Sequence, residues 1–247
     1  ILAKNSRRAF FEYTPVPPQW IQSQRIYRKR PFGPLVEFFA LDTRSFRSPN
    51  TKEFHYLSHY GKDTRYFGPK QLTWLKNSLK TSHALWKVII CPQPLALIIG
   101  SGSDDFDGIS SGLREALGRE LELKDLLAFI KREKISNTVW VSADVHYAAA
   151  HHFHPERAHE QDFLPFWEFV AGPLNAATLG PRRLDVSFGA SCEFKSVPDK
   201  MRGGRSPLDE LQFYGLGEVD PDSQQLKITL HDLNGKELFN KMLIPSI

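Results

Sequence analysis

The chain of 247 residues is long enough for one large domain or two small ones with a sizeable apolar core. A hydrophobic fraction of 41% and an aromatic fraction of 12% exclude an intrinsically disordered protein, and a formal net charge of +4 is too small to indicate nucleic-acid binding by itself. No apolar run approaches the length of a transmembrane helix, and no signal peptide is visible. The first residue is Ile rather than Met, so we expect the sequence to start inside a longer polypeptide.

The first 34 residues are rich in Pro and Arg, and the basic, aromatic segment 25–30 precedes an apolar run at 35–42. We interpret the basic segment as a solvated edge that leads into a strand, because Lys and Arg are ordinary on edge strands. A nucleic-acid patch is the alternative, which the modest net charge disfavours. The run at 35–42 predicts a buried strand that ends in polar residues, among them Asp42 and Arg44.

Helical and strand patterns alternate along the middle of the chain, with a helix expected at 68–79, a strand at 88–91, a helix at 121–135 and a strand at 138–141. The first helix has Pro69 near its start and leucines at helical spacing. Such alternation predicts an α/β fold with parallel strands. Residues 100–108 contain Gly-Ser-Gly, but without the fuller nucleotide-binding spacing they favour an acidic surface loop over a phosphate-binding loop.

Beyond His146 short strands dominate the pattern, at 166–171, 212–219, 226–230 and 238–243. Asn234 and Gly235 separate the last two, and Asn-Gly is a strong hairpin signal. The C-terminal end is therefore predicted to be an antiparallel meander. Residues 172–206 are Gly- and Arg-rich and are predicted to be an irregular loop.

The strongest chemical signal follows the predicted strand at 138–141, where the sequence reads Ser-Ala-Asp-Val-His and ends at His146. Ligand sites of open α/β sheets lie at the carboxyl ends of the strands, and a carboxylate with an imidazole suits a divalent or trivalent metal. Asp144 and His146 are therefore candidate metal ligands. The alternative is a loop Asp that caps a turn beside a surface His.

Further histidines follow at 151, 152, 154 and 159. If one strand ran from 145 to 153, His146 and His152 would share a face, so we expect the later histidines to line the rim of a site around His146. Arg44 offers a planar fork for phosphate oxygens, and a structural ion pair between Asp42 and Arg44 is the alternative.

Nucleophilic catalysis has little support in the sequence. There is no Gly-x-Ser-x-Gly motif, and the apolar neighbours of Cys91 include no group that would activate a thiolate. A disulfide between Cys91 and Cys192 is possible, but a buried thiol is the preferred interpretation for Cys91.

Several segments in the same order resemble the PhoD family of alkaline phosphatases and phosphodiesterases, within the calcineurin-like metallophosphatases. They lie at 41–47, 67–75, 86–89, 105–108, 142–146, 166–176 and 212–245. Two positions depart mildly from the family pattern: Ala143 stands where Gly is usual, and Phe106 where Trp is usual.

The resemblance implies a metallophosphatase-type sandwich of mixed sheets flanked by helices, and hydrolysis of phosphate mono- or diesters by a metal-activated water. It implies two metal ions in the complete enzyme, from Fe, Ca, Zn or Mn, with Asp144 and His146 as ligands and Arg44 neutralising charge on the phosphoryl group. The expected partner is a small phosphate ester rather than a nucleic acid, and the expected location is exported or at the cell surface.

The early metal ligands of the family have no counterpart in this sequence. We therefore interpret residues 1–247 as the C-terminal part of a single PhoD-like domain, whose partner is the missing N-terminal half of the same polypeptide. Two ligands alone cannot hold a dinuclear centre. The alternative function is a non-catalytic binding or scaffold module that retains the fold without a complete metal centre.

Overall fold

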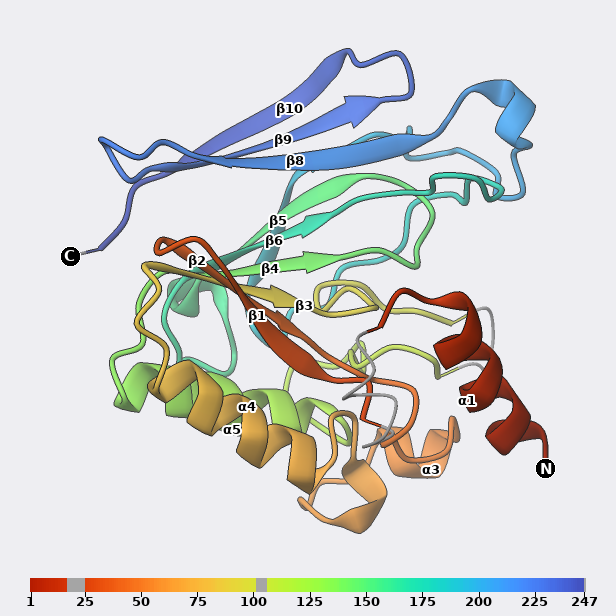
Figure 1. Ribbon diagram of the computed structural model, residues 1–247. Coiled ribbons are helices and arrows are strands. Elements are labelled where there is room, and N and C mark those ends of the chain that lie inside the picture. Colours follow the sequence, from red (N-terminus) through yellow and green to blue (C-terminus); the bar gives the residue numbers. More distant parts are fainter. Residues whose placement is uncertain (17–24, 101–105, 247) are drawn as a thin grey trace.

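A mixed β-sheet forms the centre of the computed structural model, which describes residues 1–16, 25–100 and 106–246. Within these residues seven strands line up in the order β1-β2-β3-β4-β6-β5-β7 (Figure 1). Their bounds are β1 Arg28–Phe32, β2 Val36–Ala40, β3 Trp86–Ile90, β4 Thr138–Ser142, β5 Ala149–Phe153, β6 Phe166–Val170 and β7 Ala190–Lys195. The central strands β2, β3, β4 and β6 run parallel, whereas β1, β5 and β7 pair antiparallel with their neighbours.

Helices connect the parallel strands. Helix α4 (Pro69–Lys80) lies between β2 and β3 in the chain, and α5 (Glu120–Arg132) lies between β3 and β4. The other helical elements of the described residues are α1 (Leu2–Tyr13), α3 (Lys52–His55), η1 (Lys62–Thr64), η2 (Pro155–Arg157) and η3 (Pro207–Asp209). Since parallel neighbours need a crossover connection, these strand–helix–strand units explain the alternating sequence pattern.

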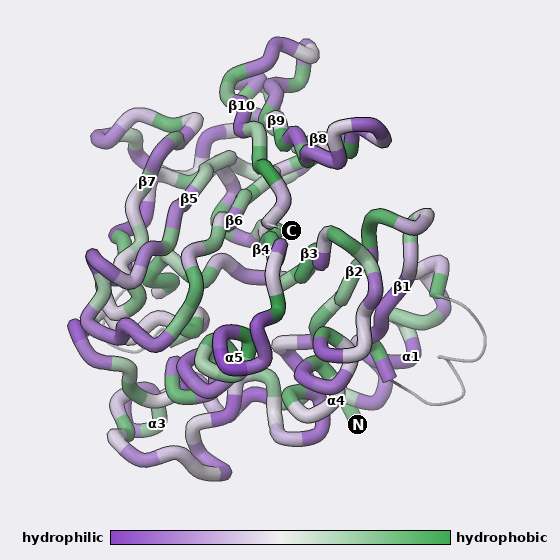
Figure 2. Tube along the Cα trace, turned by 90° about the vertical axis from the view of Figure 1, so that its left-hand side faces the viewer, coloured by the Kyte–Doolittle hydropathy of each residue, from purple (hydrophilic) through white to green (hydrophobic). Residues whose placement is uncertain are grey.

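A second, antiparallel sheet in the order β10-β9-β8 follows, with β8 at Phe213–Val219, β9 at Leu226–Asp232 and β10 at Glu237–Leu243. Figure 2 shows the strands of the larger sheet in a row between this smaller sheet and the helices α4 and α5. The α/β class and the C-terminal meander are thereby confirmed.

The larger sheet buries apolar side chains on both faces. Phe39, Ile89 and Trp140 point into the core shared with α4 and α5, and each is 0% exposed. Val88 and Phe169 pack on the other side against the smaller sheet. Alternation along each strand explains both layers, because successive side chains point to opposite faces.

Glu122 on α5 joins this helix to the start of α4. Its Oε2 accepts hydrogen bonds from the backbone N–H groups of Tyr66, Phe67 and Gly68 at 2.8, 2.6 and 3.1 Å. Gly68 has φ +75°, and a Cβ there would lie 2.8 Å from the Cβ of Phe46. Only glycine meets both conditions without strain, so the turn into α4 depends on this residue.

Two expectations about local structure are wrong. Residues 172–206 are not wholly irregular, because Ala190–Lys195 forms β7 and pairs with β5. Residues 145–153 are not one strand, because β5 begins only at Ala149. The left-handed backbone of His146, at φ 63°, interrupts the extended conformation that a strand needs.

The N-terminal segment differs in part from the prediction. Basic residues do occupy an edge strand, β1, as expected. The helix α1, however, precedes it, and none of its residues is buried. The acidic loop expected at 100–108 lies largely outside the described residues, which omit 101–105. In the described part of the chain, no helix is long and apolar enough to cross a membrane.

Candidate functional site

Polar side chains gather beyond the carboxyl ends of β2 and β4. Asp42 and Arg44 follow β2, and Asp144 and His146 follow β4. Because β2, β3 and β4 are parallel, their carboxyl ends meet at one edge of the sheet. This is the edge at which open α/β sheets bind ligands.

Arg44 joins the two strand ends. Its Nη1 and Nη2 donate to Oδ1 and Oδ2 of Asp107 at 2.7 and 2.9 Å, a two-pronged arrangement. Its Nη2 also lies 3.4 Å from Oδ1 of Asp144. The side chain of Arg44 is 53% exposed, so part of the guanidinium faces solvent. The structure thus brings together Arg44 and Asp144, which the sequence singled out separately.

Asp107 also belongs to this site, although no local sequence pattern marks it as a site residue. Besides Arg44, its carboxylate accepts from Nη2 of Arg47 at 2.5 Å, Nδ2 of Asn50 at 2.9 Å and Nε2 of Gln93 at 2.7 Å. Burial raises the pKa of Asp107, but the hydrogen bonds from Arg44, Arg47 and Asn50 and the charge of Arg47 outweigh it and lower the pKa to about 2. Asp107 is therefore a permanent anion that orients Arg44.

Arg119 holds the loop that carries Asp107. It is 1% exposed, and its Nη1 donates to the carbonyl oxygens of Phe106 and Gly108 at 2.7 and 3.0 Å. Its Nη2 donates to the carbonyl oxygen of Ser48 at 2.7 Å. A buried guanidinium with fixed donors thus ties the Asp107 loop to the segment that follows Arg47.

Asp42 has a structural role. Its Oδ1 accepts the backbone N–H groups of Arg44 and Ser45 at 3.0 and 2.9 Å, which closes a turn at the strand end. The side chain of Gln71 on α4 accepts a hydrogen bond from the backbone N–H of Asp42 and donates one to the carbonyl oxygen of Asp42. The alternative of an ion pair between Asp42 and Arg44 is wrong, because the guanidinium pairs with Asp107 and Asp144 instead.

Asp144 and His146 flank a buried anchor. Val145 between them is 1% exposed, and its N–H donates to the carbonyl oxygen of Ala143 at 2.9 Å. Asp144 and His146 have φ values of 72° and 63°. Such left-handed backbone costs of order 1–3 kcal/mol at each non-Gly residue, so the surrounding structure must hold this turn. The strain lies at the two residues with candidate chemistry.

The ring of His146 is oriented by a backbone carbonyl. Its Nδ1 lies 2.6 Å from the oxygen of Ala177. Because a carbonyl only accepts, Nδ1 carries the hydrogen, and Nε2 keeps a lone pair for a ligand. Burial raises the pKa of Asp144, and the positive charge of Arg44 opposes that effect.

This donor set fits part of a metal centre. A carboxylate and an imidazole with its tautomer fixed are suitable ligands. In the part of the chain that the structure describes, however, no group of three or more His, Cys, Asp or Glu side chains is arranged to hold a metal ion. Further ligands would have to come from elsewhere.

The later histidines do not line a rim around His146. His151 is 1% exposed inside the larger sheet, where its Nδ1 lies 3.0 Å from Oε2 of Glu168. His152 stacks on Trp167 with ring centroids 4.7 Å apart. That expectation assumed a continuous strand from 145 to 153, which the turn at His146 breaks.

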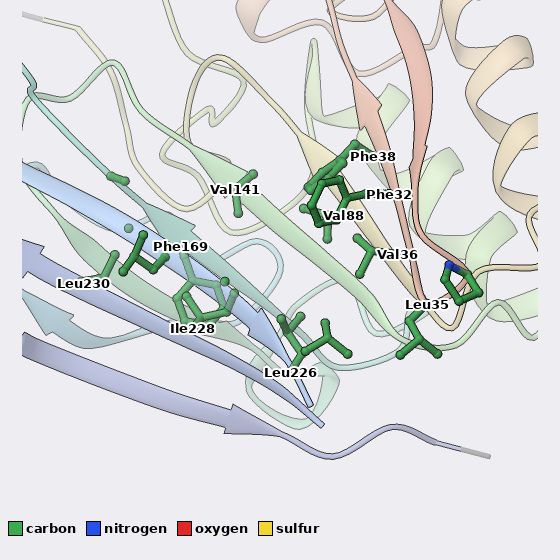
Figure 3. Close-up of a pocket in the computed structure, with 16 residues that line it drawn as sticks. Phe32, Leu35, Val36, Phe38, Val88, Val141, Phe169, Leu226, Ile228 and Leu230 are labelled. Atoms are coloured by element: carbon green, nitrogen blue, oxygen red, sulfur yellow. The ribbon is translucent and has the colours of Figure 1, made fainter. Parts of the chain in front are cut away.

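A large apolar pocket lies elsewhere, between the two sheets. It measures about 470 Å³, and Figure 3 shows Val36, Val88, Phe169 and Ile228 among its walls. Its lining includes none of the residues Arg44, Asp107, Asp144 or His146. The polar site at the strand edge is thus separate from this pocket.

Comparison with known proteins agrees with the resemblance noted in the sequence. A solved structure of PhoD superposes with a TM-score of 0.60 at 19% sequence identity, covering 98% of this chain and 48% of that one, which shows a shared fold. The chain therefore spans about half the length of that structure. No curated protein matches the sequence. A family model described as PhoD-like phosphatase matches residues 1–230, and the chain belongs to that family.

Proposed function

We propose that this chain is part of a metal-dependent phosphoesterase that hydrolyses phosphate mono- or diesters. One observation carries the proposal: His146 keeps Nε2 free beside Asp144, at the strand edge where Arg44 presents a partly exposed guanidinium. Membership of the PhoD-like phosphatase family supports the phosphoesterase class. The contacts of Arg44, Asp144 and His146 at this strand edge support the proposed roles of these residues.

Asp144 and His146 would hold metal in the complete protein. Metal ions bound there would supply a water of lowered pKa and a clamp on the phosphoryl oxygens. Iron, calcium, zinc and manganese are the candidate metals, and two ions are proposed.

Arg44 would bind the phosphoryl group. Arg44 has further N–H groups besides those directed at Asp107 and Asp144. These would donate to phosphoryl oxygens, and the positive charge would balance charge that develops there. Asp107 holds the guanidinium in place by two bonds, so the fork is oriented before substrate arrives.

We further propose that the remaining metal ligands belong to an N-terminal half of the same polypeptide, so that residues 1–247 form the C-terminal part of one domain. The partial donor set among the described residues and the double length of the PhoD structure support this proposal. The apolar pocket lies beside β8, which is an edge strand of the smaller sheet. Residues of the proposed N-terminal half could cover both the pocket and this edge.

The test uses the full-length protein encoded by the parent gene. Asp144→Ala and His146→Ala should each abolish metal-dependent hydrolysis of bis-p-nitrophenyl phosphate and lower metal content in elemental analysis. His231→Ala, on β9 of the smaller sheet, is the matched control and should retain both. Unchanged turnover in both site variants would contradict the assignment.

A non-catalytic binding module is the second candidate, and the absence of a three-residue metal group among the described residues favours it. Metal content and diester hydrolysis distinguish the two functions. A binding module predicts a full-length protein that contains no stoichiometric metal and does not hydrolyse the diester with any of the four metals added.

A further inference from the structure

Three titratable side chains lie in a row across the neighbouring strands β6, β5 and β7. His151 on β5 stands directly opposite Glu168 on β6 and directly opposite Cys192 on β7. Residues directly opposite in paired strands share a face and lie side by side. The register therefore places a carboxylate, an imidazole and a thiol in line, in the order Glu168, His151, Cys192.

The inner part of this row is buried and hydrogen-bonded. Glu168 is 0% exposed and His151 is 1% exposed. The carboxylate of Glu168 accepts the backbone N–H groups of Leu95 and Ala96 at 2.6 and 3.2 Å, so its orientation is fixed. Its Oε2 also lies 3.0 Å from Nδ1 of His151. Because a carboxylate accepts, Nδ1 carries the hydrogen, and Nε2 is the ring atom left for the sulfur.

The outer end of the row reaches solvent. Cys192 is a free thiol and is exposed, on the edge strand β7. Its side chain lies beside that of His151 across the β5–β7 pair, and the interaction between the two raises the pKa of His151. Sγ also lies 3.3 Å from the carbonyl oxygen of Phe194, which can accept the thiol hydrogen when the sulfur is neutral. A reagent can thus approach the sulfur from solvent, while the cross-strand neighbour of Cys192 is the buried imidazole of His151.

The surrounding charges favour a protonated ring. Burial lowers the pKa of His151, but the hydrogen bonds to Cys192 and Glu168 and the negative charges of both outweigh it and raise the pKa to about 9. The other titratable groups that interact with this row are Tyr147, Lys195 and Cys91, and Arg182 interacts with Tyr147. A protonated imidazole beside the sulfur would stabilise a thiolate.

We propose that Cys192 is a reactive thiol, supported by His151 and Glu168, that exchanges with low-molecular-weight disulfides. The thiolate attacks one sulfur of the disulfide, a new S–S bond forms at Sγ, and the original S–S bond breaks. Its electron pair leaves with the second sulfur, which takes a proton from the imidazolium or from water. Cys192 is oxidised to a mixed disulfide and the small disulfide is reduced to one thiol.

Alkylation with iodoacetamide tests the thiol directly, with each cysteine quantified on its own peptide by mass spectrometry. Cys192 should react at pH 6 at least about tenfold faster than N-acetylcysteine, because an unperturbed thiol is almost wholly protonated there. Cys91 is the internal control: it is 0% exposed, burial raises its pKa, and it should stay unmodified until the protein unfolds. A Cys192 profile that matches N-acetylcysteine across pH 5–10 would overturn the proposal.

Two variants test whether His151 increases the alkylation rate of Cys192, or whether exposure of the thiol alone explains that rate. His151→Gln should lower the alkylation rate of Cys192 at pH 6 by about tenfold. His152→Gln, the neighbouring residue on the opposite face, should change it less than twofold. Circular dichroism checks that both variants fold; if His151→Gln does not, the wild-type pH profile decides.

Glutathione disulfide tests the exchange itself. Incubation of the wild-type protein at pH 7 should add one glutathione to the Cys192 peptide, and dithiothreitol should remove it. A protein that is alkylated rapidly but gains no glutathione would contradict the proposed exchange.

Discussion

Arg44 and Asp144 lie 100 positions apart in the sequence, yet Nη2 of the first is 3.4 Å from Oδ1 of the second. The contact crosses from the end of β2 to the end of β4, with β3 between them in the sheet. It connects the proposed phosphate-binding residue to a proposed metal ligand. Asp107 completes the arrangement from the long connection between β3 and α5.

Replacing Arg44 by Lys should lower kcat/KM for a phosphodiester by about tenfold or more in the full-length protein, because Lys keeps the charge but loses the planar fork. Steady-state kinetics measure this effect. Arg114→Lys, at an exposed position, is the control and should leave kcat/KM unchanged. Equal kinetics for the two variants would remove Arg44 from the proposed mechanism.

Acid should destabilise the protein through Asp107. Its folded pKa, about 2, is lower than the usual value of 3.8, so its contribution is present above pH 4 and is lost as pH falls toward 2. The shift corresponds to about 2 kcal/mol. Urea unfolding at pH 5 and pH 2.5 should show a smaller loss of unfolding free energy in Asp107→Asn than in wild type. A parallel loss in both proteins would contradict the role of this carboxylate.

The stability of the folded protein should also depend on pH through His55, over a higher pH range than through Asp107. Its side chain is 4% exposed, Nε2 lies 2.8 Å from the carbonyl oxygen of Ser110, and burial lowers its pKa to about 4. The unfolded ring binds protons more readily, so stability should fall as pH drops from about 6.5 to 4, by up to about 3 kcal/mol. Thermal unfolding of His55→Gln, whose amide can still donate to Ser110, should be less sensitive to pH over this range.

Leu230→Ala should test the contact between the two sheets. Leu230 on β9 is 0% exposed and packs in the apolar layer with Phe169. Removing it should cost about 2–5 kcal/mol of unfolding free energy, since the cavity cannot close fully. Leu233→Ala, in the hairpin and 43% exposed, should change stability by less than about 0.5 kcal/mol. Similar values for both would mean that the sheets do not share a packed core.

Much of the architecture was predictable from local pattern. The helix α4 and the strands β3, β4, β8, β9 and β10 lie close to their predicted positions, because periodicity of apolar residues reflects which face is buried. The strand β7 was missed, because its burial pattern is mostly intermediate and exposed and therefore lacks apolar alternation. Turns were harder still: the left-handed residues Asp144 and His146 have no glycine to mark them.

The sequence by itself determined the α/β class, the C-terminal meander and the Asp144–His146 pair, because each depends on residues close together in the chain. Tertiary structure decided which distant groups meet. Asp107 reaches Arg44, and Cys192 reaches His151, only through strand order and register. Such pairings carry no local periodicity, since side chains tens of residues apart become neighbours only when the sheet assembles.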